Sequence, residues 1–396
     1  MKNGVAITGM GITSALGYGI EANYNSLILN NHGLSFPEIL NTKHLNLPVG
    51  EIKKSNVELQ NELQLTGGHS YTRAALLAIS AVKEAIAIAN LNKEQLTKTG
   101  LISGSSVGGI DATEEFYNEY ESSSENRRFI RAQHPGFTTS KIGEYFQING
   151  YTTTISTACS SGANAIMMGA RLIRSGKLER VIVGGTDCLT KFTLNGFNSL
   201  KILSENFCKP FDDHRDGLNL GEGAAFLVLE ADHLLQGKKV LGRISGYGNS
   251  NDAFHQTASS ETGEGAFLAM EKALQISALQ ASDIDYINAH GTATKNNDLS
   301  ESVAIKRMFG ENIPAFSSTK TFTGHTLAAA GALEAVFSIL SLQNDKQFAN
   351  LNFSEAMLET KLVPVTSVRS VRMQHILSNS FGFGGNCTSL IFSKNG

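Results

Sequence analysis

Six short apolar runs, each followed by small or polar residues, most strongly constrain how this chain can fold. Each run spans four or five residues, which is too short for an ordinary helix and typical of a strand buried on both faces. Between them lie segments with small apolar residues at helical spacing, as in residues 70–90. Strands that alternate with helices predict an α/β fold in which helices cover the sheets. The expected strands are 5–9, 100–104, 181–185, 226–229, 286–289 and 389–392.

The order of these elements is partly repeated along the chain. The first half opens with a strand and closes near residue 230, and a new strand is expected from Gly242. With 396 residues, 41% of them hydrophobic, the chain is long enough for two closely packed halves. We therefore predict two related halves, residues 1–241 and 242–396. The most polar stretch, residues 115–128, should form a surface excursion.

Composition and charge exclude several classes of protein. A formal net charge of -3 gives no general attraction to nucleic acid or to an anionic membrane. The four cysteines lack both the paired spacing of a zinc site and the density of a secreted disulfide scaffold. The N-terminus has no signal peptide, and no apolar run approaches the roughly 20 residues of a membrane helix. We therefore expect a cytoplasmic protein without a membrane span.

Cys159 stands where an expected strand passes into an expected helix. The residues before it are β-branched, and apolar residues after it recur at helical spacing. Unpaired amides and the helix dipole at such a junction favour the thiolate, which is the form that attacks carbonyl carbons. A buried cysteine is more often structural than reactive, and that interpretation is kept for Cys188, Cys208 and Cys387.

Two histidines stand at comparable junctions. His290 follows the expected strand 286–289, and His325 precedes an alanine-rich helix. A helix N-terminus disfavours protonation of a nearby histidine, and a neutral imidazole can donate an N–H to developing negative charge. Both histidines lie in loops rich in glycine and threonine, with Lys320 five residues before His325. The other eight histidines are interpreted as structural, with His255 as an exception to consider because it lies in a polar loop.

Together these motifs resemble the β-ketoacyl synthases of the thiolase superfamily, in particular the elongating KAS I and KAS II group. The resemblance covers essentially the whole chain and consists of an ordered set of motifs. It implies a thiolase-like fold in which two duplicated halves form the layers α-β-α-β-α. The motifs are residues 5–11, 157–159, 209–217, 221–223, 288–292, 319–320, 324–325 and 379–385.

The resemblance also implies a role for each site residue. The Cys-His-His triad of the family falls on Cys159, His290 and His325, whereas thiolases replace one of these partners. Lys320 would order the site, and Phe383 would gate it. The backbone N–H groups of Phe383 and Cys159 would form an oxyanion hole. The other implied residues are Thr292 and Thr294 for the phosphopantetheine arm, Asp298, Glu301 and Glu334 as supporting acids, and Asn288, Ala289, Glu334, Ser378 and Asn379 for a monovalent cation.

The implied reaction is a ping-pong condensation. Cys159 would accept an acyl group from an acyl carrier protein, and malonyl carrier protein would then lose carbon dioxide and attack that group. No cofactor or catalytic metal is expected, because decarboxylation drives the reaction and phosphopantetheine arrives on the carrier. A homodimer, or a heterodimer with a related chain length factor, is expected. Arg127, Arg128 and Arg131 form the expected docking cluster for the acidic carrier.

The sequence departs from the family pattern after Phe383. Most relatives read Gly-Gly-Thr-Asn there, whereas this chain reads Gly384-Gly385-Asn386-Cys387, and the region before Lys209 is short. Both differences lie in loops that are expected to shape acyl entry. They leave room for a specialised synthase, such as one that builds polyenes, in place of the housekeeping fatty-acid enzyme.

Three other functions match parts of the sequence. A serine hydrolase would use Ser106, because residues 104–108 match G-x-S-x-G, but it would leave Cys159 and the histidine loops unexplained. A non-catalytic partner subunit would have lost the nucleophile that this chain keeps. Nucleotide binding through Gly9 and Gly11 lacks a ribose-binding acid at the required spacing.

Overall fold

In the computed structural model, which describes residues 4–66 and 70–395, eleven strands join in one continuous sheet. All six runs expected to be strands lie in it, most of them extended by several residues. In spatial order its main path runs β4 (Thr152–Ile155), β3 (Gly100–Gly104), β5 (Arg180–Asp187), β6 (Gly223–Ala231), β1 (Val5–Ser14), β7 (Gly242–Asn251), β13 (Asn386–Ser393), β12 (His375–Phe381), β8 (Tyr286–Asn288) and β9 (Ala315–Ser317), with β2 (Gly17–Tyr18) paired to β1.

The two halves of this sheet have the same strand order. From the outer edge inward, the strands are β4-β3-β5-β6-β1 in the first half and β9-β8-β12-β13-β7 in the second. If the main-path strands of each half are numbered in chain order, leaving out β2, β10 and β11, both halves have the order third, second, fourth, fifth, first. In both halves the second strand pairs in parallel with the third and the fourth. The halves meet where β1 pairs with β7 in antiparallel fashion. The duplicated α/β fold expected from the sequence is therefore confirmed, and the expected boundary after residue 241 falls immediately before β7.

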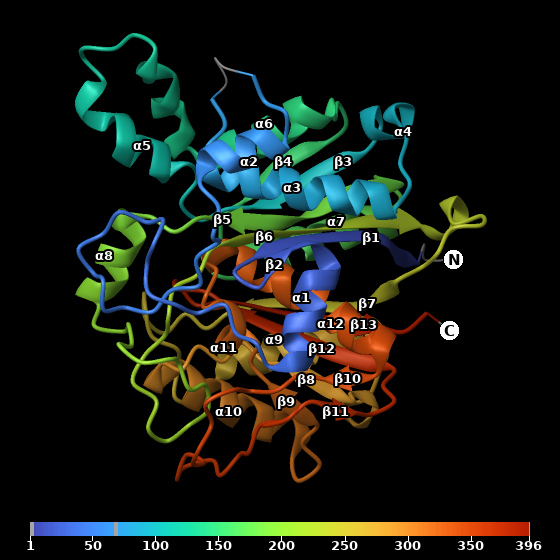
Figure 1. Cartoon of the computed structure of the whole chain (residues 1–396). Helices are drawn as coiled ribbons and strands as arrows, with labels where there is room; N and C mark the ends of the chain where they lie inside the picture. The colour runs from blue at the N-terminus through green and yellow to red at the C-terminus, as the bar shows by residue number, and fades with distance from the viewer. Residues whose placement is uncertain (1–3, 67–69, 396) are drawn as a thin grey trace.

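Helices complete the layered arrangement (Figure 1). α3 (Arg73–Ile88) covers β1 and β6 on one outer face, and α9 (Glu264–Ser277) covers β7 and β13 on the other. α7 (Ser161–Arg174) and α12 (Ala330–Asn344) contact each other between the two halves. The remaining elements are α1 (Gly19–Leu29), α2 (Asn56–Glu62), α4 (Lys93–Thr97), α5 (Ile110–Phe116), α6 (Pro135–Phe146), α8 (Lys191–Ser199), α10 (Lys295–Phe309), α11 (Lys320–Thr323), β10 (Lys346–Gln347) and β11 (Arg369–Ser370).

Glycines in β1 allow α3 to lie directly against the strand. A Cβ atom at Gly9 would come within 2.2 Å of the carbonyl oxygen of Ala85, and one at Gly11 within 2.0 Å of that of Ala81. The two glycines therefore serve close helix-to-strand packing, and the backbone of α3 occupies the space that a bound phosphate would need. This arrangement does not support nucleotide binding through Gly9 and Gly11.

The middle-layer helix α12 corrects one expectation from the sequence. Residues Leu327–Asn344 have the length and hydropathy of a membrane helix, so the expectation that no apolar run approaches that length is wrong. However, 89% of this segment is buried inside the protein. Its apolar surface is covered by the two halves of the sheet, which explains why nearly every position is apolar or small.

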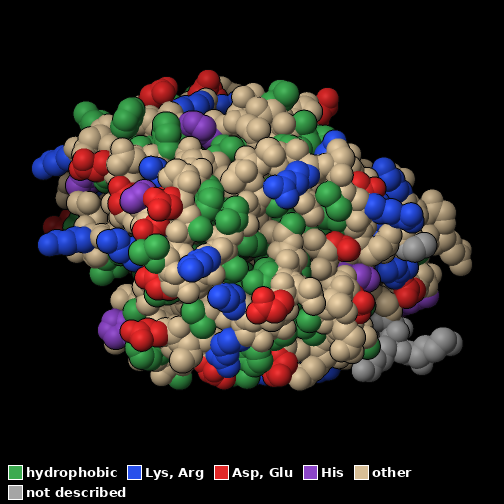
Figure 2. Space-filling view, turned by 90° about the horizontal axis from the view of Figure 1, so that it is seen from below, with side chains coloured by type: hydrophobic (Ala, Val, Ile, Leu, Met, Phe, Trp, Pro, Cys, Tyr) green, Lys and Arg blue, Asp and Glu red, His purple; other side chains and the backbone are tan. Residues whose placement is uncertain are grey.

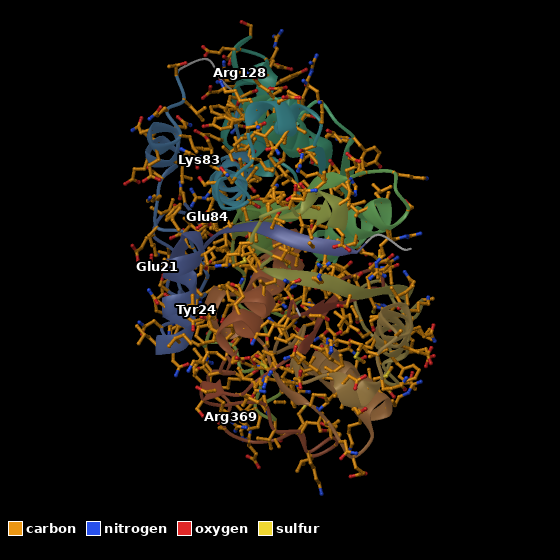
Figure 3. The ribbon with its side chains drawn as sticks, turned by 90° about the vertical axis from the view of Figure 1, so that its right-hand side faces the viewer. Glu21, Tyr24, Lys83, Glu84, Arg128 and Arg369 are labelled. Carbon is orange, nitrogen blue, oxygen red and sulfur yellow. The ribbon has the colours of Figure 1, made fainter. Side chains whose placement is uncertain are left out.

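The polar stretch at residues 115–128 forms the expected excursion. α5, the 3₁₀ turn Tyr117–Glu119 and the 3₁₀ segment Asn126–Gln133 project at one end of the molecule (Figure 1). Phe116 stacks on Phe129 inside this projection, with 4.6 Å between the ring centroids. Arg128 lies at this end of the molecule (Figure 3).

Candidate active site

Cys159 lies in the turn between β4 and α7, as the sequence predicts. Ala158, the residue before it, has φ 50°, a left-handed conformation that costs a non-glycine residue of order 1 kcal/mol or more. The first helical residue secures this turn, because the Thr157 N–H donates to Ser161 Oγ at 2.9 Å and that hydroxyl donates to the Ala158 carbonyl at 2.6 Å. The Cys159 side chain is only 6% exposed.

A cavity of about 560 Å³ brings together residues from both halves of the chain. Six of the residues selected from the sequence line it: Cys159, His290, Thr292, Thr294, His325 and Phe383. The other selected residues lie outside the cavity wall: Lys320, Asp298, Glu301, Glu334, Asn288, Ala289, Ser378, Asn379, Arg127, Arg128 and Arg131.

The duplicated fold explains why these distant residues meet. Cys159 lies between the third strand of the first half and the central helix α7, and His325 lies between the third strand of the second half and the central helix α12. His290 follows β8, the strand that pairs in parallel with β9. Because the carboxyl ends of parallel strands share one edge of a sheet, the loops that follow them converge on one site.

The hydrogen bonds of the two histidines fix their tautomers. His325 Nδ1 accepts the Leu327 N–H at 3.1 Å, and His290 Nδ1 lies 3.2 Å from the ammonium of Lys320, which can only donate. Burial first, and then Lys320, holds the pKa of both rings well below the usual value, and His325 lowers that of His290 further. Both rings are therefore neutral with the proton on Nε2. The ring centroids lie 5.5 Å apart.

Lys320 contacts the His290 loop from behind the cavity wall. Besides His290 Nδ1, its ammonium contacts the His290 carbonyl oxygen and forms a buried ion pair with Glu334. Burial raises the pKa of Glu334, and Lys320 opposes that shift. These contacts are the ones through which Lys320 would order the site, and that role stays a prediction.

Two carboxylates of α10 hold the loop that carries His290. Glu301 accepts the backbone N–H groups of His290 at 2.9 Å and Gly291 at 2.8 Å, and Asp298 accepts that of Thr292 at 2.9 Å. Burial raises the pKa of both acids, that of Glu301 to about 7. The same loop presents Thr292 and Thr294 to the cavity, with 2.9 Å between their hydroxyl oxygens.

The loop that contains Phe383 passes directly over the nucleophile turn. A Cβ atom at Gly382 would lie 2.7 Å from the Thr157 carbonyl oxygen and 3.2 Å from the Cys159 nitrogen, so no side chain fits between the two segments. The Phe383 ring stacks on Phe197 of α8, with 5.8 Å between centroids. The backbone N–H groups of Phe383 and of Cys159 itself both interact with the Cys159 thiol.

The electrostatics of Cys159 differ from the sequence-based expectation. Burial raises the pKa of its thiol to about 11, and the opposing effects of Lys320 and the two N–H groups do not offset this. The backbone N–H groups at the turn therefore favour the thiolate, as expected, but burial outweighs them.

We predict that alkylation of Cys159 by iodoacetamide accelerates by about tenfold per pH unit from pH 7 to pH 10. Only the thiolate reacts, and with a pKa of about 11 its fraction grows throughout this range. Mass spectrometry of the labelled peptide gives the rate, with free cysteine as the control, whose rate levels off above its pKa of about 8.5. A plateau for Cys159 at or below pH 8 would contradict the prediction.

Several residues at the site were not predicted as functional residues. Phe197, Phe381 and Cys387 line the cavity, as does His255, the exception noted among the histidines. Asn386, noted only as a departure from the family pattern, bonds to side chains beside the nucleophile. Phe381 falls within the motif 379–385 but was assigned no role, and the proximity of His255, Asn386 and Cys387 depends on how β7 and β13 pair.

Ser106 does not have the partners of a hydrolase nucleophile. Its hydroxyl donates to the Ala158 carbonyl at 3.3 Å, and its N–H donates to buried Asp187 at 3.1 Å. Within residues 4–66 and 70–395 no histidine hydrogen-bonds to it, and it does not line the cavity. The G-x-S-x-G match therefore has no catalytic geometry.

The site combines a buried thiol with two neutral imidazoles and two backbone N–H groups. This combination is typical of a site for acyl transfer through a covalent thioester. Residues 2–234 match the family described as Beta-ketoacyl synthase, N-terminal domain, and residues 241–354 match Beta-ketoacyl synthase, C-terminal domain. The chain belongs to the β-ketoacyl synthase family, which comprises condensing enzymes of the acyltransferase class.

Full-length relatives agree with this assignment. The 3-oxoacyl-(acyl-carrier-protein) synthase 2 of Staphylococcus aureus (strain COL) is 31% identical over 98% of both chains, and that of Rhizobium meliloti (strain 1021) is 34% identical over the same shares. Among solved structures, a chain from the complex of a ketosynthase with its chain length factor from Xenorhabdus doucetiae is 30% identical, with a TM-score of 0.87 over 99% of this chain and 98% of that one. A chain of the ishigamide ketosynthase/chain length factor is 26% identical, with a TM-score of 0.93 over all of both chains.

Proposed function

We propose that this chain condenses malonyl carrier protein with an acyl group held on Cys159, in fatty-acid or polyketide synthesis. The observation that carries the proposal is the meeting of Cys159, His290 and His325, from three segments of the chain, at one cavity. The relatives named 3-oxoacyl-(acyl-carrier-protein) synthase 2 support the carrier protein as the source of both substrates.

In the first half-reaction Cys159 attacks the thioester of an acyl carrier protein. The sulfur loses its proton and bonds to the acyl carbon, and the carrier's phosphopantetheine thiol leaves with a proton. The backbone N–H groups of Cys159 and Phe383 stabilise the intermediate oxyanion, and each such donor can contribute about 3 kcal/mol. Thr292 and Thr294 hold the pantetheine arm in the cavity.

In the second half-reaction malonyl carrier protein binds in the same cavity. The Nε2–H groups of His290 and His325 donate to its thioester oxygen while the bond to the carboxylate breaks and carbon dioxide leaves. The resulting enolate carbon attacks the acyl carbon on Cys159, and the C–S bond breaks to release a 3-oxoacyl carrier protein. Neither half-reaction requires a redox cofactor or a catalytic metal.

A monovalent cation would fit behind the histidines. Asn288 Oδ1 is buried, and among the described residues it has no hydrogen-bond partner. Oxygen donors of this kind suit a hard cation. Asn288, Ala289, Glu334, Ser378 and Asn379 would hold it, and it would stabilise the backbone at the end of β8 and in the middle of β12.

A second candidate is the active subunit of a specialised ketosynthase heterodimer. Two observations favour it: the solved structures described above contain chain length factors, and Asn386 and Cys387 replace the usual residues after the gating loop. In this candidate a related chain without the nucleophile completes the dimer and sets the length of the product.

Docking of the acidic carrier at Arg127, Arg128 and Arg131 stays a prediction. Arg127 and Arg131 are exposed, whereas Arg128 is half-buried and pairs with Glu125 at 3.3 Å. Figure 2 shows the face opposite the projection that carries Arg128, and on that face basic and acidic side chains are mixed, without one extended basic patch. A cytoplasmic location for this reaction is likewise part of the proposal.

Mass spectrometry of the protein incubated with a series of acyl carrier proteins tests the function. We expect one acyl group per chain, mapped to Cys159, followed by its transfer to a 3-oxoacyl carrier protein when malonyl carrier protein is added. An adduct confined to another residue, or no adduct with any acyl chain, would refute the proposal. A chain that is acylated but condenses only with a related partner would favour the heterodimer over the homodimer.

A further inference from the structure

The oxyanion hole of the proposed reaction depends on two segments that are far apart in the chain. The Cys159 N–H belongs to the turn before α7, and the Phe383 N–H belongs to the loop between β12 and β13. Two N–H groups stabilise one oxygen atom only if their spacing is fixed. A residue that bonds to both segments would therefore control the rate of the reaction without contacting the substrate.

Asn386 is bonded to both segments. Its backbone carbonyl accepts the Gly382 N–H at 2.8 Å, which closes the loop that carries Phe383. Its side-chain oxygen accepts from Ser160 Oγ at 2.8 Å and from Asn164 Nδ2 at 2.8 Å. Ser160 directly follows Cys159, and Asn164 belongs to the first turns of α7. Asn386 itself does not line the cavity.

The surrounding donors fix the orientation of this side chain. Asn249 Nδ2 of β7 also donates to Asn386 Oδ1, at 3.0 Å, so two amide groups and a hydroxyl converge on one oxygen. Rotation of the Asn386 amide by 180° would place its NH₂ group against the NH₂ groups of Asn164 and Asn249. The observed orientation avoids this contact and presents an acceptor to both amide groups.

A carboxamide suits this position better than the threonine of most relatives. An amide oxygen accepts two or more hydrogen bonds and carries no proton. A threonine hydroxyl also carries a proton, which needs an acceptor of its own. Asn386 therefore meets donors from β7, the nucleophile turn and α7, with the Thr388 hydroxyl as a fourth donor at 3.4 Å, while its backbone closes the Phe383 loop.

We propose that Asn386 is a positioning residue that holds the Phe383 N–H at a fixed distance from the Cys159 N–H. The inference rests on the proposed function, since it assigns Asn386 a role in forming the acyl-Cys159 thioester. Loss of the side chain would free the Phe383 loop from the nucleophile turn. A displacement of about 1 Å at such a site can lower a rate by about 100-fold.

The test compares acylation of Cys159, which forms an oxyanion, with alkylation by iodoacetamide, which does not. The variants are Asn386→Ala, Asn386→Thr, which keeps one acceptor oxygen, and the control Asn92→Ala. Asn92 caps α4 by accepting the Gln95 N–H at 2.9 Å, so its loss lowers stability away from the site. Single-turnover acylation from an acyl carrier protein, apparent carrier affinity, alkylation rate and Tm are measured for each full-length protein.

We expect acylation of Asn386→Ala to slow by about 100-fold, with carrier affinity within about threefold of the unmodified protein and with alkylation slowed far less than acylation, because the Phe383 N–H also lowers the pKa of the Cys159 thiol. Asn386→Thr should recover part of the acylation rate, and Asn92→Ala should lower the Tm without slowing acylation. Unchanged acylation in Asn386→Ala, an equal loss of acylation and alkylation, or slower acylation in Asn386→Thr than in Asn386→Ala would overturn the inference. If the unmodified protein carried no acyl group on Cys159, the proposed function itself would fail.

Discussion

Replacing Cys159 with alanine should lower kcat for condensation by about 10⁴-fold or more, because removal of a covalent nucleophile leaves only binding and electrostatic stabilisation. No other thiol can take its place. Cys387 also lines the cavity, but burial raises the pKa of its thiol well above the usual range, and its S–H donates to the Gly385 carbonyl. Steady-state assay of 3-oxoacyl product, with the Tm as a check on folding, gives the result.

Cys188→Ala is the matched control for this experiment. Cys188 is fully buried in the core beneath α3 and does not line the cavity. Its loss should cost about 1 kcal/mol of stability and leave condensation within about threefold of the unmodified protein. Condensation by Cys159→Ala at more than a tenth of the unmodified rate, or an acyl adduct on Cys387, would contradict the assignment of the nucleophile.

Replacing His325 with alanine should slow condensation by about 10³-fold while acylation of Cys159 falls far less. The Nε2–H of His325 is free for an oxygen in the cavity because its Nδ1 accepts the Leu327 N–H. Loss of one such donor costs about 10²- to 10³-fold in rate. Acylation instead uses the two backbone N–H groups, which the substitution leaves in place. Radiolabelled acyl transfer and release of carbon dioxide from malonyl carrier protein measure the two half-reactions separately.

His233→Ala serves as the control, because His233 is exposed and pairs with Glu179 outside the cavity. It should leave both half-reactions unchanged. An equal loss of acylation and condensation in His325→Ala would indicate that His325 supports the thiol and not the enolate. Condensation by His325→Ala at the rate of the unmodified protein would show that this imidazole takes no part in the reaction.

The strands of this fold could be predicted because each is a local pattern. The runs at 100–104 and 181–185 became β3 and β5, and the weak repetition around Gly242 corresponds to a second set of strands in the same order. Buried parallel strands are apolar along their whole length, so few alternatives exist for such runs. The sequence does not distinguish α12 from a membrane helix, because a helix between two halves of a sheet and a membrane helix share the same apolar pattern.

The site could be predicted only in part. Cys159, His290 and His325 each stand at the end of a strand, and a duplicated sheet brings such ends together. The thiol pKa could not be foreseen, because burial outweighs the local effect of the helix N-terminus. The role inferred for Asn386 depends on bonds to Ser160, Asn164 and Asn249, which become its neighbours only when β13 pairs with β7 and packs against α7.

A crystal structure of the protein acylated on Cys159 tests the central claim most directly. The thioester carbonyl oxygen should lie about 2.7–3.1 Å from the backbone nitrogens of Cys159 and Phe383. His290 and His325 should then face the part of the cavity where the malonyl thioester binds. A carbonyl oxygen bonded to the imidazoles instead of the two backbone N–H groups, or imidazoles out of reach of the acyl carbon, would contradict the account.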